Sequence, residues 1–149
     1  MNRKAFTLVE IMIVVAITLL LASIAIPNLL RVRVTAQEAS AAAAMHTIAT
    51  AEIQWRISNP TYTSLAQMGS ATPPYIDAIL ATGTKQGYIF SMVVTNMNQF
   101  AACAMQQSSQ AHTFYIDESG VVCRSMGVPQ ACPGMHLGGQ CAGAWEQMQ

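Results

Sequence analysis

The 149-residue chain has few charged side chains. Seven basic and seven acidic residues make up 9% of the sequence and cancel at neutral pH, so the electrostatic footprint of a nucleic-acid-binding protein is missing. The sequence also lacks a glycine-rich phosphate loop, a Gly-x-Ser-x-Gly elbow and a pair of carboxylates on one shared element. We therefore expect no enzyme, no cofactor and no nucleic-acid partner.

Cysteine is absent from the first 102 residues. Cys103, Cys123, Cys132 and Cys141 all lie in the last third, an even number that suits disulfides in an exported domain. Three pairings are open, and we favour Cys132 with Cys141, closing a short loop rich in Pro and Gly, and Cys103 with Cys123. A zinc site that adds His136 to three of these cysteines has the wrong ligand spacing, so we expect no metal.

The remaining polar candidates have ordinary structural explanations. His46 falls on an expected helix and His112 begins an expected strand, and we interpret each as a partly exposed structural residue rather than a catalytic base. The segment Asp117-Glu118-Ser119-Gly120 has the composition of a hairpin turn, which we favour over a cation site.

The amino-terminal part contains one long apolar run. Ile11 to Leu30 is twenty residues without a formal charge. As a helix this run would span about 30 Å, the thickness of a bilayer core. Basic residues stand on both sides of it, at Arg3 and Lys4 and at Arg31 and Arg33, so the positive-inside rule leaves its orientation open.

Two ordinary explanations compete for this run. It could be a signal peptide cleaved after Ser23-Ile24-Ala25, or a permanent anchor, and either would leave an exported or anchored binding domain that does not polymerise. Neither explains Glu10, because a charge in a membrane helix costs roughly 2.5 to 3.5 kcal/mol at the centre. Its place one turn inside the helix also allows it to reach the interface.

The segment Phe6-Thr7-Leu8-Val9-Glu10 follows a short basic leader, residues 1–5. It resembles the precursors of type IV pilins and of the pseudopilins of type II secretion. The resemblance implies that a prepilin peptidase cuts between Ala5 and Phe6 and methylates the new amino group of Phe6. Ala5 stands where the family usually has glycine, and Pro27 stands where pilin helices often have a proline.

The resemblance also implies a function. The chain would be the precursor of a structural subunit of a type IV pilus or pilus-like filament, held in the inner membrane by one span and then assembled with identical subunits into a periplasmic or cell-surface filament. The peptidase and the assembly machinery would be its partners. Glu10 would pair with the Phe6 amine of a neighbour and set the register. A type II secretion pseudopilin is the alternative, and the cysteine-bounded tail favours a pilus.

The expected fold class is α+β, with a long helix from Phe6 to about Ile57 packed on a small antiparallel sheet. Residues 6–30 form the membrane or filament-core half, residues 31–57 the amphipathic half and residues 58–149 the globular part. Pro27 predicts a kink or local melting. One apolar stripe, spaced by three and four, faces the sheet: Ala41, Ala44, Ile48, Ala51 and Trp55.

The globular part is expected to contain short helical turns and a meander of strands. The turns are predicted at Ser64 to Met68 and Asp77 to Ala81. The strands are predicted from alternating apolar and β-branched residues at Tyr88 to Thr95, Gln99 to Met105, Thr113 to Asp117 and Val121 to Arg124.

Overall fold

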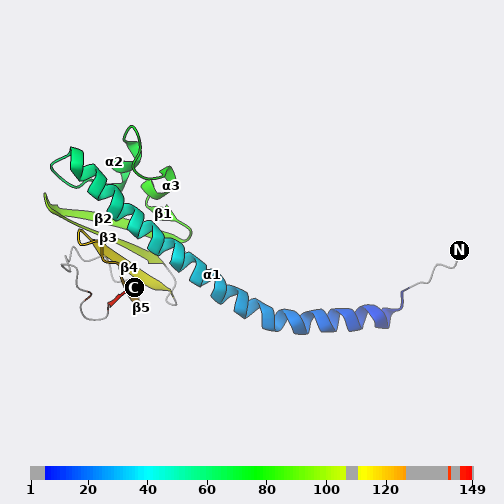
Figure 1. Cartoon of the computed structure of the whole chain (residues 1–149). Helices are drawn as coiled ribbons and strands as arrows, with labels where there is room; N and C mark the ends of the chain where they lie inside the picture. Colours follow the sequence, from blue (N-terminus) through cyan, green and yellow to red (C-terminus); the bar gives the residue numbers. More distant parts are fainter. Residues whose placement is uncertain (1–5, 107–110, 127–140, 142–144, 149) are drawn as a thin grey trace. The chain divides into compact units, whose positions relative to one another are not determined.

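The computed structural model describes residues 6–106, 111–126, 141 and 145–148. Its elements are α1 (Leu8–Ser58), α2 (Leu65–Ser70), α3 (Ala78–Ala81), β1 (Thr84–Lys85), β2 (Tyr88–Asn96), β3 (Gln99–Gln106), β4 (His112–Asp117), β5 (Cys123–Met126) and β6 (Glu146–Gln147) (Figure 1). The chain divides into two compact units, Met1–Ala36 and Gln37–Gln149, and α1 runs through both. The predicted α+β fold is confirmed.

The first unit contains the apolar part of α1. Its large apolar side chains are exposed from Phe6 to Val32, and this helix is long and apolar enough to cross a membrane by length and composition. Pro27 lies inside the helix, which continues across it, so the local melting expected there is absent from this structure.

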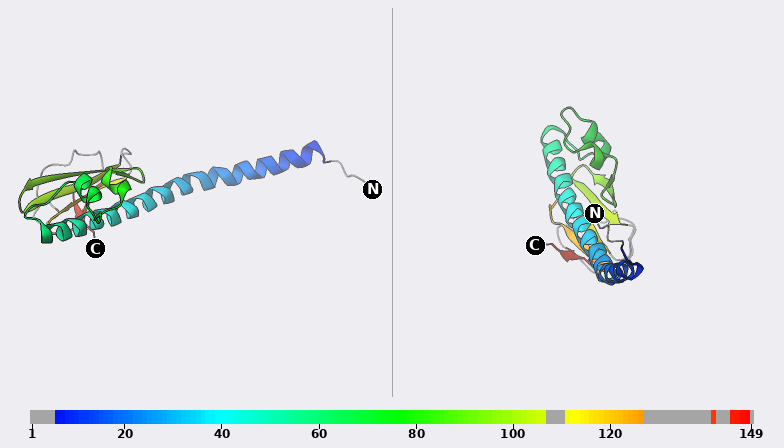
Figure 2. Two further views of the ribbon diagram at one scale, coloured as in Figure 1. Left: turned by 90° about the horizontal axis from the view of Figure 1, so that it is seen from above. Right: turned by 90° about the vertical axis from the view of Figure 1, so that its right-hand side faces the viewer.

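The second unit, Gln37–Gln149, is called the globular unit below. The second half of α1 runs along one face of the sheet, as both views in Figure 2 show. The predicted stripe is confirmed, because its alanines and Ile48 are buried against apolar side chains of the sheet. Trp55 at the end of the stripe is partly buried and meets Tyr75 edge to face, with ring centroids 5.5 Å apart. Small alanine side chains allow the helix and the sheet to approach closely.

The six strands form one antiparallel meander in the order β1 to β6. Three predicted strands agree with β2, β3 and β4 to within one residue at either end. The fourth was placed two residues too early, because the turn after β4 is longer than predicted: the Asp117 carboxylate accepts from the Ser119 N–H at 2.9 Å, and the Ser119 hydroxyl accepts from Val121 N–H at 3.3 Å. The strands β1 and β6 have two residues each, too few to produce a visible alternation.

The favoured disulfide pairing is wrong. Cys123 is bonded to Cys141, so neither Cys103 with Cys123 nor Cys132 with Cys141 can form. The sheet register gives the reason: Cys103 pairs with Tyr115, and Tyr115 pairs with Cys123, so the two cysteines lie two strands apart. That separation is about 9.6 Å, beyond the reach of a disulfide.

Each of these two strand cysteines therefore bonds elsewhere. Cys103 is also disulfide-bonded, and Cys132 and His136 lie outside the described residues. The Cys123–Cys141 bond holds the tail to the face of the sheet opposite α1, where Trp145 covers Tyr115 with ring centroids 5.9 Å apart. A zinc site that uses Cys123 and Cys141 is excluded by their disulfide.

Polar contacts fasten α1 to the sheet where the globular unit begins. The Glu38 carboxylate accepts from the backbone N–H of His112 at 2.9 Å and lies 2.8 Å from its Nδ1. Gln37 accepts a hydrogen bond from the Gln106 side-chain amide at 2.9 Å. His112 is thus oriented by Glu38, a partner that the sequence analysis did not identify. Burial, followed by the nearby Glu38 carboxylate, raises the pKa of Tyr88 above its ordinary value.

A second carboxylate lies deeper in the globular unit. Glu52 is fully buried on α1 and accepts from the backbone N–H of Thr63, at 3.2 and 3.3 Å from its two oxygens. Burial raises the pKa of Glu52 to about 7, and the Thr63 hydrogen bond offsets part of this rise. Glu52 connects the last turns of α1 to the segment that follows the helix.

The raised pKa of Glu52 predicts that stability falls as the pH rises. The folded state holds the Glu52 proton more tightly than the unfolded chain, so this stabilisation is complete below about pH 4.5 and is lost as the pH rises through about 7. The loss amounts to about 3 kcal/mol of unfolding free energy. Glu52→Gln keeps an acceptor for Thr63 and should remove this dependence in denaturant unfolding followed from pH 4.5 to 8.

Exposed Glu146 provides the control. Its side chain is 74% exposed on β6, so Glu146→Gln should leave the pH dependence of the wild-type chain unchanged. If the unfolding free energies of Glu52→Gln and the wild type changed with pH by the same amount, Glu52 would not be the group responsible for the pH dependence.

Candidate functional site

Thr7 and Glu10 cap the amino end of α1 reciprocally. The Thr7 hydroxyl accepts from the Glu10 backbone N–H at 3.2 Å, and Glu10 Oε2 accepts from the Thr7 backbone N–H at 2.9 Å. The hydroxyl of Thr7 also donates to Oε2 at 2.9 Å. This is the capping-box arrangement, in which a Thr-x-x-Glu segment satisfies backbone donors that the first helical turn leaves free. The sequence analysis missed this role of Thr7, although the Thr-x-x-Glu spacing signals it.

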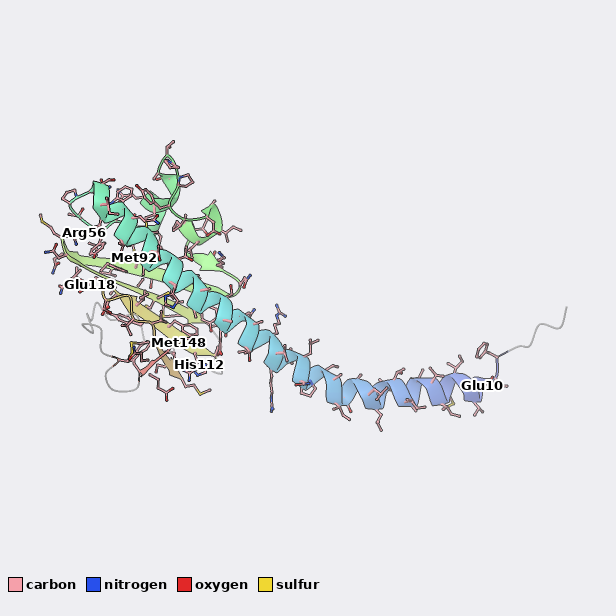
Figure 3. The ribbon with its side chains drawn as sticks, in the orientation of Figure 1. Glu10, Arg56, Met92, His112, Glu118 and Met148 are labelled. Atoms are coloured by element: carbon pink, nitrogen blue, oxygen red, sulfur yellow. A yellow bond between two sulfur atoms is a disulfide. The ribbon has the colours of Figure 1, made fainter. Side chains whose placement is uncertain are left out.

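The capping box fixes the Glu10 carboxylate while leaving part of it available. All three bonds involve Oε2 or the Thr7 hydroxyl, and within the described part of the chain Oε1 accepts no hydrogen bond. A negative charge is also favoured at this end of a helix by the aligned peptide dipoles. Figure 3 shows Glu10 in the first turn of α1. The site therefore presents an oriented carboxylate at the start of an apolar helix.

Phe6 stands immediately before the capping box. Its side chain is 80% exposed, and the residue precedes the first helical turn. Cleavage on its amino side would leave the Phe6–Thr7 peptide bond intact, so the Thr7 N–H that binds Glu10 would remain an amide. Ala5 and the leader, residues 1–5, lie outside the described residues. The capping box is thus compatible with a new amino group at Phe6.

The charged side chains of α1 that lie within the globular unit all contact other parts of that unit. Glu38 contacts His112, Glu52 contacts Thr63, and the Arg56 guanidinium donates to the Asn98 side chain at 2.7 Å and lies over the Tyr62 ring. Figure 3 shows Arg56 at the sheet end of the helix. The opposite side is exposed and carries no formal charge: Ala39, Ala43, His46, Thr47, Thr50, Ile53, Gln54 and Ile57.

Hydroxyl groups on this exposed side are already satisfied. Thr47 donates to the carbonyl of Ala43 at 3.0 Å, and Thr50 donates to the carbonyl of His46 at 2.9 Å. Their methyl groups are what remains for a partner to contact. The exposed side of the helix is therefore suited to another apolar surface, which is unusual for a helix that already covers its own sheet.

Comparison with known proteins gives two matches. Residues 1–26 match the model of the prokaryotic N-terminal methylation motif. The chain is also 28% identical over 139 residues to the type IV wide pilus major component PilA4 of Thermus thermophilus, a match that covers 89% of this chain and 98% of that protein. These findings support a type IV pilin-family protein. No solved structure matches the chain.

The residues that match the methylation-motif model include the start of α1, where Phe6, Thr7 and Glu10 lie within one five-residue segment. Within the described residues no group of three or more His, Cys, Asp or Glu side chains could hold a metal ion.

Loss of the Thr7 hydroxyl should loosen the first turn of α1. Thr7→Val keeps the branched shape and removes the Glu10 N–H acceptor, a change worth about 1 kcal/mol, or about a five-fold faster amide exchange at Glu10. Amide exchange by NMR of the full chain in detergent micelles would measure it. Thr18→Val is the matched control, because the Thr18 hydroxyl only donates back to the Val15 carbonyl. Equal Glu10 exchange in both variants would contradict the capping role.

Proposed function

We propose that the chain is the precursor of a structural subunit of a type IV pilus. A prepilin peptidase cuts between Ala5 and Phe6 and methylates the Phe6 amine, and the mature subunit polymerises through α1. The observation that carries the proposal is the joint presence of the capped Glu10 and an apolar helix exposed from Phe6 to Val32. An anchor needs the apolar helix, and a neutral residue could cap it as well, whereas a filament of such helices also needs a charge that can pair with the Phe6 amine.

The apolar half of α1 must be kept out of water both before and after assembly. Each large apolar side chain of the first unit contributes about 1.5 to 3 kcal/mol when it is fully removed from water. The bilayer provides this environment before assembly, and a bundle of identical helices provides it afterwards. Successive subunits related by a screw operation make contacts that do not close, so the filament can grow without limit.

Glu10 sets the register of the bundle. The carboxylate already accepts from Thr7 through Oε2, while Oε1 is available to the Phe6 amine of a neighbouring subunit. Two opposite charges in an apolar bundle must meet, because removal of one partner from a buried pair costs about 3 to 5 kcal/mol. Misaligned helices would leave both charges unpaired. The pair thus destabilises misaligned arrangements of the helices more than it stabilises the correct one.

A pilus is favoured over a type II secretion pseudopilus by the comparison along the whole chain. PilA4 is described as the major component of a wide pilus, and its similarity extends over 89% of this chain rather than over the methylation motif alone. The chain is accordingly proposed to reside in the inner membrane before assembly and on the cell surface afterwards, with the peptidase and the pilus assembly machinery as partners.

Mass spectrometry of the mature chain tests the processing step. The expected product begins at Phe6 and carries one methyl group on its amino nitrogen. Ala5→Gly introduces the residue usual in the family and should give the same product, whereas Ala5→Arg should block cleavage because a bulky charged side chain replaces a small one. A product that begins at Ile26 would instead indicate signal peptidase, and retained Met1 would indicate a permanent anchor.

Substitution of Glu10 separates its charge from its capping role. Glu10→Gln keeps an oxygen that can accept from Thr7 but cannot pair with an amine, whereas Glu10→Leu loses both. Both variants should be processed and inserted yet give no filaments detectable by electron microscopy, with exposed Glu146→Gln as a control of normal yield. If Glu10→Gln assembled at the wild-type yield, Glu10 would serve only as a cap, and the registry role would be refuted.

A further inference from the structure

The outer edge of β2 is only partly paired. On one side β2 pairs with β3 along its length, whereas on the other side β1 covers only Tyr88 and Ile89 (Figure 1). The backbone N–H of Phe90 donates to the carbonyl of Gly83 at 2.7 Å, the last contact on that side. The edge from Met92 to Asn96 continues without a neighbouring strand among the described residues.

The direction of the free backbone groups follows from this last contact. In an antiparallel ladder the N–H and C=O groups of one residue point to the same side, and the side alternates along the strand. Because Phe90 points away from β3, Met92 and Val94 do so too, and the ladder stays regular as far as Val94. In the described part of the chain neither has a hydrogen-bond partner on the outer side.

Apart from the irregularity between Val94 and Asn96, this edge lacks the features that usually keep an exposed strand from pairing. Natural edge strands are protected by charged side chains, proline, great shortness or a cover. The sequence Ser91-Met92-Val93-Val94-Thr95-Asn96 has no charge and no proline, and it is rich in β-branched residues that favour strands. Val93 is 46% exposed and Val94 is 38% exposed. The edge therefore offers both free backbone groups and an uncharged surface.

We propose that β2 pairs antiparallel with β2 of a second copy of this chain, about a two-fold axis at Val93. In this register the N–H and C=O groups of Met92 and Val94 bond those of Val94 and Met92 in the other copy. The register is symmetric, and every residue from Ser91 to Thr95 meets another uncharged residue. We favour a second copy as the partner because this register pairs backbone donors with acceptors and leaves no charge opposite an apolar side chain. In the proposed filament, copies of the chain would also be present at high local concentration.

This contact is distinct from the one that builds the filament. A two-fold contact closes after two copies, so it cannot relate the successive subunits of a screw-related polymer. It would join unassembled subunits or subunits of neighbouring filaments. The inference uses the filament proposal only for the abundance of copies. Its failure would leave polymerisation through α1 untouched.

Cross-linking of a single cysteine tests the register. In the proposed pair the two Val93 residues face each other at a non-hydrogen-bonded position, where Cα atoms lie about 4.5 Å apart, within disulfide range. The full-length Val93→Cys chain in detergent, mildly oxidised, should give a reducible dimer on non-reducing gels. Ile89→Cys is the matched control: it lies on the same strand and is 40% exposed, but it is opposite Thr84 of β1 and should remain monomeric.

A charge at the same position provides the second variant. Val93→Lys would place two ammonium groups opposite each other, which is destabilising across a strand pair, and should abolish the dimer that the wild-type chain forms in analytical ultracentrifugation. Electron microscopy of Val93→Lys filaments should show normal filaments with reduced side-by-side association. The proposal would be overturned if Val93→Cys and Ile89→Cys cross-linked equally, or if Val93→Lys self-associated as strongly as the wild type. Pairing of this edge with a different protein would also overturn it.

Discussion

Exposure of the apolar side chains of α1 is the constraint on which the rest of the structure depends. From Phe6 to Val32 these side chains are exposed in the described part of the chain, and a bilayer or a bundle of helices would bury them. The globular unit therefore has to fold without help from the first half of α1, whose apolar side chains remain exposed. Polar contacts at Gln37 and Glu38, with Gln106 and His112, begin where the second compact unit begins. They fix the helix to the sheet without using the apolar side chains ahead of them.

The part of α1 in the globular unit turns both apolar and charged side chains towards the rest of that unit. Its inner side packs alanines and Ile48 on the sheet, and its three charged residues also turn inward. In an ordinary amphipathic helix the charges would face water instead. Burial of Glu52 raises its pKa to about 7, so this arrangement lowers the stability of the globular unit near neutral pH. The outer side of this part of α1 is thereby left without a formal charge, which is consistent with the proposed packing of α1 against other subunits.

Sequence patterns identified the helix, four strands and the motif at Phe6 to Glu10, because each produces a local periodicity or spacing. The disulfide pairing could not be identified in this way, since it depends on sheet register: Tyr115 separates Cys103 from Cys123 by one strand. The Glu38–His112 contact joins residues 74 positions apart and leaves no local signal. By contrast, the capping box of Thr7 and Glu10 was predictable from the sequence, because its Thr-x-x-Glu spacing is local.

The capping box also explains how one carboxylate can serve two purposes. A flexible glutamate in an apolar bundle would lose side-chain freedom when it met the amine of a neighbour, and this entropy would oppose assembly. Here Thr7 already holds Oε2 with two hydrogen bonds, so in the proposed filament most of that freedom would be lost before a neighbour bound. The remaining oxygen, Oε1, would then meet the proposed amine partner from a fixed direction. Local capping of the helix thus prepares the geometry on which the proposed register between subunits depends.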